Sequence, residues 1–292
     1  MDAAERHAYG AHFTAEADIE RVVGPTIIRP WRERIDSAPS MKQLLDLRFQ
    51  LANFKVLDPA CGSGNFLYVA YREMARLDLR ILQRINELVS ENEFAKQAKN
   101  LLVITPTQFF GIDLDGFGVE LAKVTLMLAK KLALDDALET FASVHAQLPL
   151  QPDALPLDNL DENVKHADAL FTDWPATDAI IGNPPYQSKN KRQIEMEPGY
   201  QQQLREAYPD VDGRADYCAY WFRKAHDHLK PEQRAGLVGT NTIRQNYTRE
   251  ASLDHIVNTG GTITEAVSTM VWPGWPSLVL IRSSMLAPAG GS

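Results

Sequence analysis

A short apolar run passes directly into a glycine-rich turn at residues 54–65, whose sequence is FKVLDPACGSGN. Its first four residues are typical of a short buried strand, and a helical pattern follows from about residue 66 to residue 89. An open α/β sheet places its ligand crevice at such a junction of strand and helix. Gly62 and Gly64 allow backbone conformations and close approaches that a Cβ would obstruct. The stretch predicts a ligand-binding turn, with an ordinary tight turn as the alternative.

Strands and helices alternate along the rest of the chain. Residues 16–36 look helical, although Gly24-Pro25 is expected to interrupt them, and residues 146–165 predict an irregular connection. This alternation predicts an α/β fold with a mostly parallel, twisted sheet covered by helices on both faces. The strand candidates are 109–112, 179–181, 235–239 and 278–281, and the helix candidates are 117–132 and 215–229.

The composition is that of a globular protein, with 45% apolar and 23% charged residues among 292. No stretch approaches the ~18 uninterrupted apolar residues of a membrane span, and the charged N-terminus does not resemble a secretory signal. Two cysteines, Cys61 and Cys218, cannot form a disulfide framework. We therefore expect a cytoplasmic protein without membrane contact, and we expect no metal site.

The charge is unevenly distributed. The net charge is −8, and from Asn183 onward 12 Lys and Arg stand against 11 Asp and Glu, which leaves 18 against 27 before it. An acidic balance argues mildly against nucleic acid, because DNA affinity rests largely on cations at phosphates. Lys189, Lys191 and Arg192 form a local basic cluster. They are equally compatible with a solvated loop and with a weak DNA footprint.

The glycine turn suits a ligand that carries both a carboxylate and an ammonium group. Backbone amides at the start of the following helix can receive a carboxylate, and Asp58 at the strand end can attract a cation. A ligand with both groups is an amino acid, and S-adenosylmethionine contains one. The residues expected around that end of the cofactor are Asp58, Ala60, Gly62, Ser63 and Gly64.

Two later strand ends extend the same site. Asp113 follows the strand candidate at residues 109–112 and can bind both hydroxyls of a ribose, with a helix cap as the alternative. Leu114 can pack on an adenine face. In the pair Asp168-Ala169, Asp168 is interpreted as the acceptor for the adenine amino group of the cofactor.

The sequence IIGNPPY at residues 180–186 is the most informative motif of the chain. Pro184 and Pro185 fix the backbone and remove two amide donors. The oxygen of Asn183 and the carbonyl of Pro184 can each accept a hydrogen from a planar substrate's NH₂ group. Tyr186 can stack on its ring, a contact worth about 1–3 kcal/mol in nucleic-acid sites. The four residues 183–186 are the expected catalytic residues, and a proline-stiffened turn with a core tyrosine is the alternative.

An adenine inside duplex DNA cannot reach such a loop unless it is flipped out of the base stack, which costs a few kcal/mol. A second aromatic side chain on the opposite face of the base would help to hold it. Trp272 and Trp275 are the candidates, and a core tryptophan in a turn is an equally good interpretation of either one.

The order of these motifs resembles the N6-adenine DNA methyltransferases in which the cofactor motifs precede Asn-Pro-Pro-Tyr. The resemblance implies a Rossmann-like fold that uses S-adenosylmethionine and double-stranded DNA with a flipped adenine. It also implies that Thr14, in the early element YGAHFT at residues 9–14, contacts the cofactor. The family often has Tyr-Thr-Pro there, whereas this chain has Phe13-Thr14-Ala15.

Stretches such as RADY at residues 214–217 and GLVGTN at residues 236–241 are most similar to the methyltransferase domain of single-polypeptide type II restriction–modification enzymes. The resemblance implies a helical segment at 1–53 with a cofactor-closing element, a catalytic domain at 54–284 and a disordered tail at 285–292. Nuclease and target recognition domains are expected to be absent, so the isolated chain should have low activity. The alternatives are a methyltransferase for RNA or for a protein glutamine, cytosine N4 as the target, and a non-catalytic DNA-binding subunit.

Overall fold

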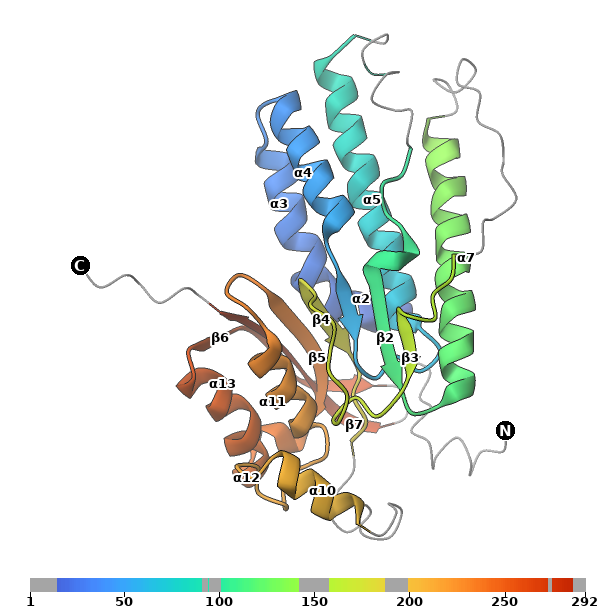
Figure 1. The fold of residues 1–292 in the computed structure, drawn as a ribbon. Helices are drawn as coiled ribbons and strands as arrows, with labels where there is room; N and C mark the ends of the chain where they lie inside the picture. Colours follow the sequence, from blue (N-terminus) through green and yellow to red (C-terminus); the bar gives the residue numbers. More distant parts are fainter. Residues whose placement is uncertain are drawn as a thin grey trace, which may run out of the picture.

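The structure is a computed structural model that describes residues 15–90, 94, 101–141, 158–186, 199–272 and 275–285, with only the backbone from residue 268 onward. Within these residues seven strands form one sheet in the order β3-β2-β1-β4-β5-β7-β6 (Figure 1). The first five in the chain are parallel neighbours, and β7 runs antiparallel to both β5 and β6. The strands are β1 (Val56–Asp58), β2 (Phe109–Asp113), β3 (Val164–His166), β4 (Ala179–Gly182), β5 (Arg234–Thr240), β6 (Gly261–Trp272) and β7 (Trp275–Met285).

The strand order reverses next to β1. The chain proceeds from β1 to β2 and β3 on one side of the sheet, and then returns to β4 and β5 on the other side. In an open α/β sheet such a reversal opens a crevice beyond the carboxyl ends of the strands. Site residues predicted from the sequence lie at the ends of β1, β2 and β4.

Alternate residues of the strands enter two different cores, because successive side chains of a strand point to opposite faces. Val56, Ile181 and Val238 belong to one core, whereas their neighbours Leu57, Ile180 and Leu237 belong to the other. The first core is formed with α2 (Glu16–Val23), η1 (Gly24–Ile28), α3 (Arg29–Ser37), α4 (Met41–Asn53), α5 (Asn65–Leu88) and α7 (Gly116–Thr140). The second is formed with α10 (Tyr200–Ala207), α11 (Ala219–His228), η3 (Asn241–Arg244) and η4 (Glu250–Asp254), followed by α13 (His255–Asn258). The predicted sheet with helices on both faces is confirmed.

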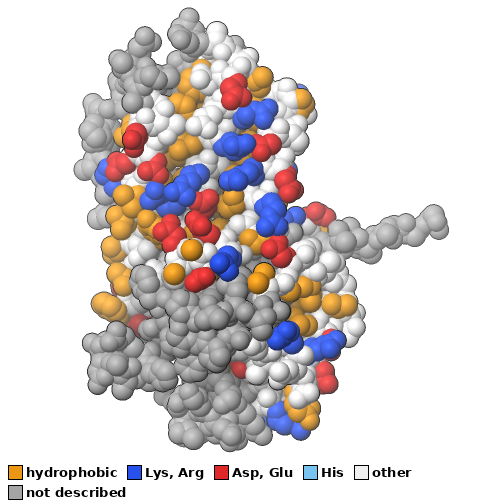
Figure 2. Space-filling model, turned by 180° about the vertical axis from the view of Figure 1, so that it is seen from behind, with side chains coloured by type: hydrophobic (Ala, Val, Ile, Leu, Met, Phe, Trp, Pro, Cys, Tyr) orange, Lys and Arg blue, Asp and Glu red, His pale blue; other side chains and the backbone are white. Residues whose placement is uncertain are grey.

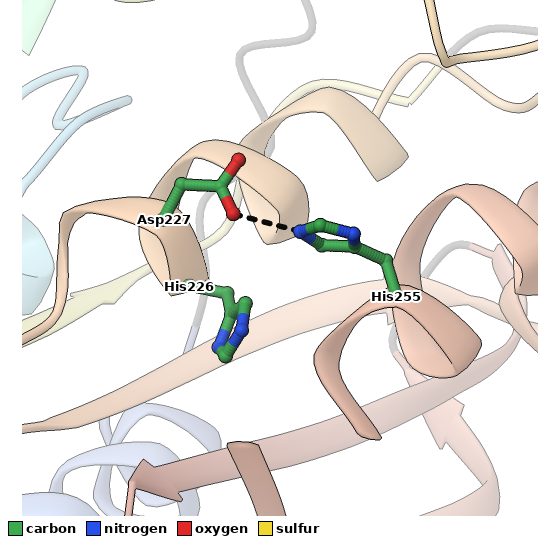
Figure 3. A group of neighbouring side chains, drawn as sticks. All are labelled: His226, Asp227 and His255. Carbon is green, nitrogen blue, oxygen red and sulfur yellow. Dashed lines mark hydrogen bonds and ion pairs between the residues drawn. The ribbon is translucent and has the colours of Figure 1, made fainter. Parts of the chain in front are cut away.

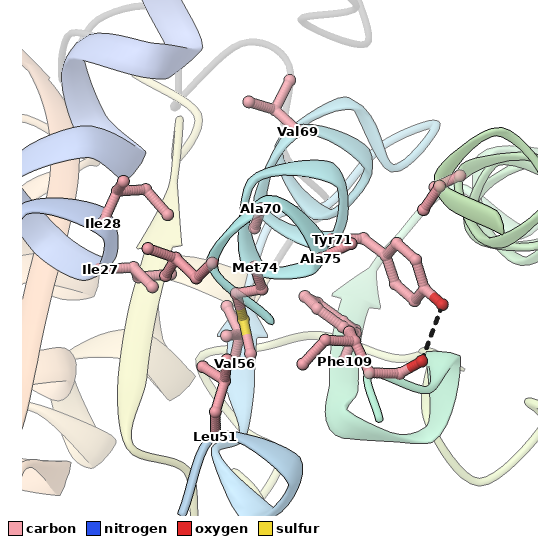
Figure 4. Close-up of a cluster of buried hydrophobic side chains, with 14 of the residues drawn as sticks. Ile27, Ile28, Leu51, Val56, Val69, Ala70, Tyr71, Met74, Ala75 and Phe109 are labelled. Atoms are coloured by element: carbon pink, nitrogen blue, oxygen red, sulfur yellow. Dashed lines mark hydrogen bonds between the residues drawn. The ribbon is translucent and has the colours of Figure 1, made fainter. Parts of the chain in front are cut away.

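The first core is centred on α5, as Figure 4 shows. Tyr71 is completely buried, its ring centroid lies 5.2 Å from that of Phe109, and its hydroxyl donates to the carbonyl oxygen of Ile104 at 3.0 Å. The N-terminal helices share this core, and α4 is also joined to α5 by a buried ion pair between Arg48 and Asp78, 2.6 Å from Nε to Oδ1. The domain boundary at residue 53 stays a prediction.

The expected interruption at Gly24-Pro25 takes the form of a π-helical turn, η1, between α2 and α3. The widened turn uses a hydrogen bond from the amide of Arg29 to the carbonyl of Gly24, five residues earlier. Pro25 stands in the first positions of this turn, where a missing amide hydrogen costs least. The chain therefore stays helical from Glu16 to Ser37.

Several elements differ from the sequence interpretation. The helix expected to end near residue 132 continues to Thr140, and β3 begins inside the segment expected to be irregular. The helix α4 and the edge strand β6 were not predicted. In α4 the buried residues Leu44, Leu47 and Leu51 do have helical spacing after the N-cap Ser40, so its signal was present in the sequence and was not used. The residues of β6 show no strict alternation, and its pairing with β7 contains register shifts.

The face of the molecule seen from behind carries Lys and Arg side chains interspersed with Asp and Glu, as Figure 2 shows. Ion pairs on α5 illustrate this balance, with Arg72 2.7 Å from Asp136 and Arg80 2.7 Å from Asp36. Paired charges give little long-range attraction for phosphate. No described helix is both long and apolar enough to cross a membrane.

Candidate active site

The glycine turn leaves β1 and is tied to β2 by its backbone. The amide of Cys61 donates to the carbonyl of Ile112 at 3.1 Å, and the amide of Gly62 donates to Oδ2 of Asp113 at 2.7 Å. Gly64 has a φ of 84° directly before α5, and a Cβ on it would lie 2.9 Å from Cα of Ala122 on α7. The turn therefore needs glycine for its conformation and for its contact with α7.

Asp58, the last residue of β1, is 1% exposed. Its Oδ1 accepts the amide hydrogen of Ala60 at 3.0 Å, while its Oδ2 is buried without a hydrogen-bond partner among the described residues. Burial raises the pKa of this carboxyl to about 8, and the nearby Asp113 adds to the effect. A buried oxygen with no partner is costly, and a bound cation would relieve the cost.

Asp113 braces the turn as well as ending β2. Its Oδ2 accepts from Gly62, and its Oδ1 accepts from the amide of Asp115 at 2.9 Å. The expected capping role falls to Asp115, whose side chain accepts from the amide of Phe117 at the start of α7. Leu114, between the two acids, is 59% exposed, so an apolar side chain is open to contact at this strand end. Ribose binding by Asp113 and adenine contact by Leu114 stay predictions.

Asp168 lies two residues after β3, beyond Asp113 at the same edge of the sheet. Its Oδ1 accepts the amide hydrogen of Leu170 and its Oδ2 accepts the hydroxyl hydrogen of Tyr200, both at 2.8 Å. Ala169 is buried in the second core. Tyr200, at the start of α10, also hydrogen-bonds to the hydroxyl of Tyr217. The sequence offered no signal for Tyr200, and binding of an adenine amino group by Asp168 stays a prediction.

The Asn-Pro-Pro-Tyr loop begins where β4 ends. A Cβ on Gly182 would lie 2.5 Å from Oδ1 of Asp58, so this glycine lets the loop and the turn approach each other. Oδ1 of Asn183 is buried and has no hydrogen-bond partner among the described residues. Pro184 is buried and Tyr186 is half-buried. Two buried, unpaired oxygens, from Asp58 and Asn183, thus stand at the ends of neighbouring strands.

Tyr186 of this loop packs against the first core and is affected electrostatically by residues that precede α11. Burial raises the pKa of Tyr186, and Cys218 and the carboxylate of Asp216 add to the shift. Asp216 is held by the hydroxyls of Thr240 and Thr242, at 3.2 and 3.0 Å from its Oδ2. The sequence singled out RADY at 214–217 only as a resemblance, without a role for Asp216.

Asn241 is a third candidate, which the sequence interpretation did not assign. It follows β5, the parallel neighbour of β4, and its Oδ1 is buried without a hydrogen-bond partner in the described part of the chain. The ends of β1, β4 and β5 therefore each carry such an oxygen, on Asp58, Asn183 and Asn241. Trp221 of α11 contacts the turn after β1, because its Nε1 donates to the carbonyl of Pro59 at 3.2 Å.

Some predicted residues fall outside the described residues. These are Thr14 with the early element at residues 9–14, and the basic cluster of Lys189, Lys191 and Arg192. Only the backbone of Trp272 and Trp275 is described.

The described residues fit the amino-acid end of S-adenosylmethionine. The unpaired oxygen of Asp58 can accept a hydrogen bond from an ammonium group. The turn after it leads into the start of a 24-residue helix, whose free amide groups favour a carboxylate. At the end of the neighbouring strand, the unpaired oxygen of Asn183 can accept a hydrogen bond from a second molecule. The arrangement can hold a cationic amino acid and an amine-bearing substrate at adjacent strand ends.

Comparison with known proteins agrees with these features. Residues 34–275 match the family model described as the DNA-methyltransferase domain of MmeI. The chain is 25% identical over 280 residues to DNA methyltransferase A of Bacillus subtilis (strain 168), covering 91% of this chain and 30% of that protein. It is 23% identical over 269 residues to the adenine-specific methyltransferase PglX of Streptomyces coelicolor, covering 80% of this chain and 21% of that one.

A solved structure with the same fold is that of the type IIL restriction–modification enzyme MmeI in complex with DNA. It superposes with a TM-score of 0.77 at 25% sequence identity, over 99% of this chain and 39% of that chain. The chain thus spans well under half the length of these relatives.

Proposed function

This chain belongs to the MmeI DNA-methyltransferase domain family, and from that membership we propose that it transfers a methyl group from S-adenosylmethionine to the N6 amino group of adenine in DNA. The observation that carries the proposal is the pair of buried, unpaired oxygens on Asp58 and Asn183 at the ends of neighbouring parallel strands. One suits the cofactor's ammonium group and the other suits the substrate's amine.

The cofactor supplies an electrophilic methyl group on a sulfonium. Asp58 holds the ammonium end, and the amides that follow Gly62 and Gly64 receive the carboxylate. Asp113 binds the ribose hydroxyls with the lone pairs that Gly62 and Asp115 leave free, and Leu114 covers the adenine. The remaining members of the proposed set are Thr14, Ala60, Ser63, Asp168 and Ala169.

The substrate amine is oriented by two acceptors, Oδ1 of Asn183 and the carbonyl of Pro184. Hydrogen bonds from the amine to both oxygens reduce the conjugation of its lone pair with the ring and direct that lone pair toward the methyl group. Methyl transfer, in which the N–C bond would form as the S–C bond breaks, needs positioning more than a strong base. These residues would contribute alignment and hydrogen bonds that strengthen as charge develops on the amine, and the amine proton would leave to solvent. Pro185 stiffens the loop, and Tyr186 stacks on the base.

Adenine in DNA is the proposed substrate for two reasons. One relative, which aligns with 80% of this chain, is named as an adenine-specific methyltransferase, and the matching family is a DNA-methyltransferase domain. The base enters by flipping out of the duplex. We further propose that the chain is the modification part of a cytoplasmic restriction–modification enzyme, since the structure with a TM-score of 0.77 is of that class. Recognition and nuclease parts would then act together with it.

The test is incubation of the chain with methyl-labelled S-adenosylmethionine and duplex DNA, followed by nucleoside analysis. The expected product is N6-methyladenine. N4-methylcytosine would change the base assignment, and labelled RNA or labelled protein glutamine with unlabelled DNA would overturn the substrate.

A matched pair of variants separates chemistry from folding. Asn183→Ala should lower the rate by about 10²-fold or more, the order found for loss of one preorganised hydrogen-bonding group. Asn53→Ala, at an exposed position at the end of α4, should leave the rate unchanged. Equal rates for both variants would remove Asn183 from the mechanism.

A further inference from the structure

A cluster of three side chains outside the active site has the composition of a metal site. His226 and Asp227 belong to α11, and His255 begins α13 on the other side of a narrow gap (Figure 3). Each offers one donor atom, and the three atoms lie within 4.8 Å of one another. Nothing in the proposed methyl transfer uses them.

The hydrogen bonds around His226 determine which ring nitrogen carries its proton. The hydroxyl of Thr259 donates its single hydrogen to the carbonyl of His255, at 2.7 Å. It must therefore accept from Nε2 of His226, which lies 2.6 Å away. Nδ1 is left with a free lone pair, and this atom is buried without a hydrogen-bond partner among the described residues.

His226 is only 2% exposed, so its unpaired nitrogen is costly unless something binds there. The neighbouring pair, His255 and Asp227, is more accessible to an ion from solvent, since their side chains are 15% and 50% exposed. Nε2 of His255 lies 2.7 Å from Oδ1 of Asp227. The two imidazole rings are 5.4 Å apart between centroids and nearly perpendicular.

We propose that His226, Asp227 and His255 bind a divalent transition-metal ion of the Zn²⁺ class, which fastens α13 to α11. Two imidazoles and one carboxylate suit such an ion, and water would complete a tetrahedral shell. Ligand atoms about 2.1 Å from Zn²⁺ stand roughly 3.4 Å from one another in a tetrahedron. The donor atoms, now within 4.8 Å of one another, would adjust to this spacing, and Nε2 of His255 and Oδ1 of Asp227, now 2.7 Å apart, would separate slightly. Binding through Nε2 of His255 requires that the hydrogen bond between this nitrogen and Asp227 is given up, and the metal–nitrogen bond takes its place.

Among the described residues these three side chains form the group of possible metal ligands, and Arg223 orients one of them. Arg223 donates to the other oxygen of Asp227 at 3.1 Å, which orients the carboxylate and keeps it monodentate. Cys218 precedes His226 by eight residues, about 12 Å along α11, so its sulfur does not compete. The ion would stabilise the passage from α13 into β6, which begins at Gly261.

The experiment is calorimetric titration of the metal-stripped chain with Zn²⁺, with melting temperature as a second measurement. The wild type should bind one more ion than either His255→Gln or Asp227→Asn, and Zn²⁺ should raise the melting temperature of the wild type only. His228→Gln is the matched control, because His228 lies on α11 outside the cluster and contacts the carbonyl of Pro175.

Cobalt provides an independent spectroscopic result. Co²⁺ in place of Zn²⁺ should give visible absorption of a four-coordinate nitrogen and oxygen site in the wild type and in His228→Gln, and none from this site in His255→Gln. Equal Zn²⁺ stoichiometry in all four proteins, or no binding at all, would overturn the proposal. Because methylation is not the measurement, either result leaves the proposed function untouched.

Discussion

At the scale of single residues, the proton on Asp58 links the cofactor site to stability. Burial raises its pKa to about 8 in the folded protein, compared with 3.8 ordinarily. Between these values the folded state keeps a proton that the unfolded chain has lost, so this group makes the free energy of unfolding fall as pH rises through that window. Asn in its place keeps the oxygen that accepts from Ala60 and does not titrate.

We therefore expect Asp58→Asn to melt higher than the cofactor-free wild type, by a margin that grows between about pH 5 and about pH 8. The same variant should lose measurable binding of S-adenosylmethionine, because no carboxylate remains for its ammonium group. Thermal denaturation at both pH values and a calorimetric titration check the two results. Asp46→Asn, exposed on α4, is the control; a margin that does not change with pH would contradict the role of the buried carboxyl.

Asn241 tests whether the site extends to the third strand end. Its unpaired oxygen lies at the end of β5, which β4 separates from β1. Asn241→Ala should slow methylation about tenfold, the effect of one hydrogen bond of ~1.4 kcal/mol. Cofactor affinity should not change. The control is Asn258→Ala, exposed at the end of α13, which should methylate at the wild-type rate. Weaker cofactor binding by Asn241→Ala would instead place Asn241 in the cofactor site and contradict a role toward the substrate.

At the scale of elements, the glycine turn depends on one left-handed residue. Gly64 has a φ of 84° and no room for a Cβ against α7. Gly64→Ala should lower the free energy of unfolding by about 1–3 kcal/mol and weaken cofactor binding as the start of α5 shifts. Gly24→Ala, where φ is −53° and nothing lies within 4 Å of the added carbon, should raise it by roughly 0.5–1 kcal/mol. Chemical denaturation measures both, and equal effects would refute the steric argument.

The elements that could be predicted from sequence are those whose ends are marked by particular residues, such as glycine, proline or aspartate after an apolar run. The runs before Asp58 and Asn183 were found because an apolar strand meets a turn of special residues there. By contrast, β6 pairs only at the edge of the sheet and contains register shifts against β7, so its residues show no strict alternation. The π-helical turn at Gly24 depends on the tertiary core around Pro25 and Ile27, which local propensity does not contain.

At the scale of the whole molecule, the candidate site combines segments that are far apart in the chain. Asp58, Asn183 and Asp113 could be predicted because each stands at the end of a strand candidate in a known kind of motif. Trp221 and Tyr200 could not, because their partners Pro59 and Asp168 are 162 and 32 residues away, and only the folded chain brings them together. The same holds for His226 and His255.

The balance of charge over the whole chain leads to a last prediction, about sequence preference. Phosphate contacts position a protein on DNA, whereas base contacts carry specificity. This chain has a net charge of −8, its described basic residues are largely paired, and it spans 39% of the length of the MmeI chain. We expect the 292 residues alone to methylate adenine slowly and in many sequence contexts, with a shallow dependence on salt.

A pool of duplexes with randomised sequence measures this directly. After incubation with cofactor, methylated adenines should be spread over the pool with no dominant motif, and Asn183→Ala should leave the pool unmodified. The salt dependence of the rate in the same assay counts the phosphate contacts, since each one steepens the slope. Rapid modification of one defined sequence would mean that the base contacts lie within this chain, and the region after β4 would then be the place to look for them, because from Asn183 onward basic residues slightly outnumber acidic ones.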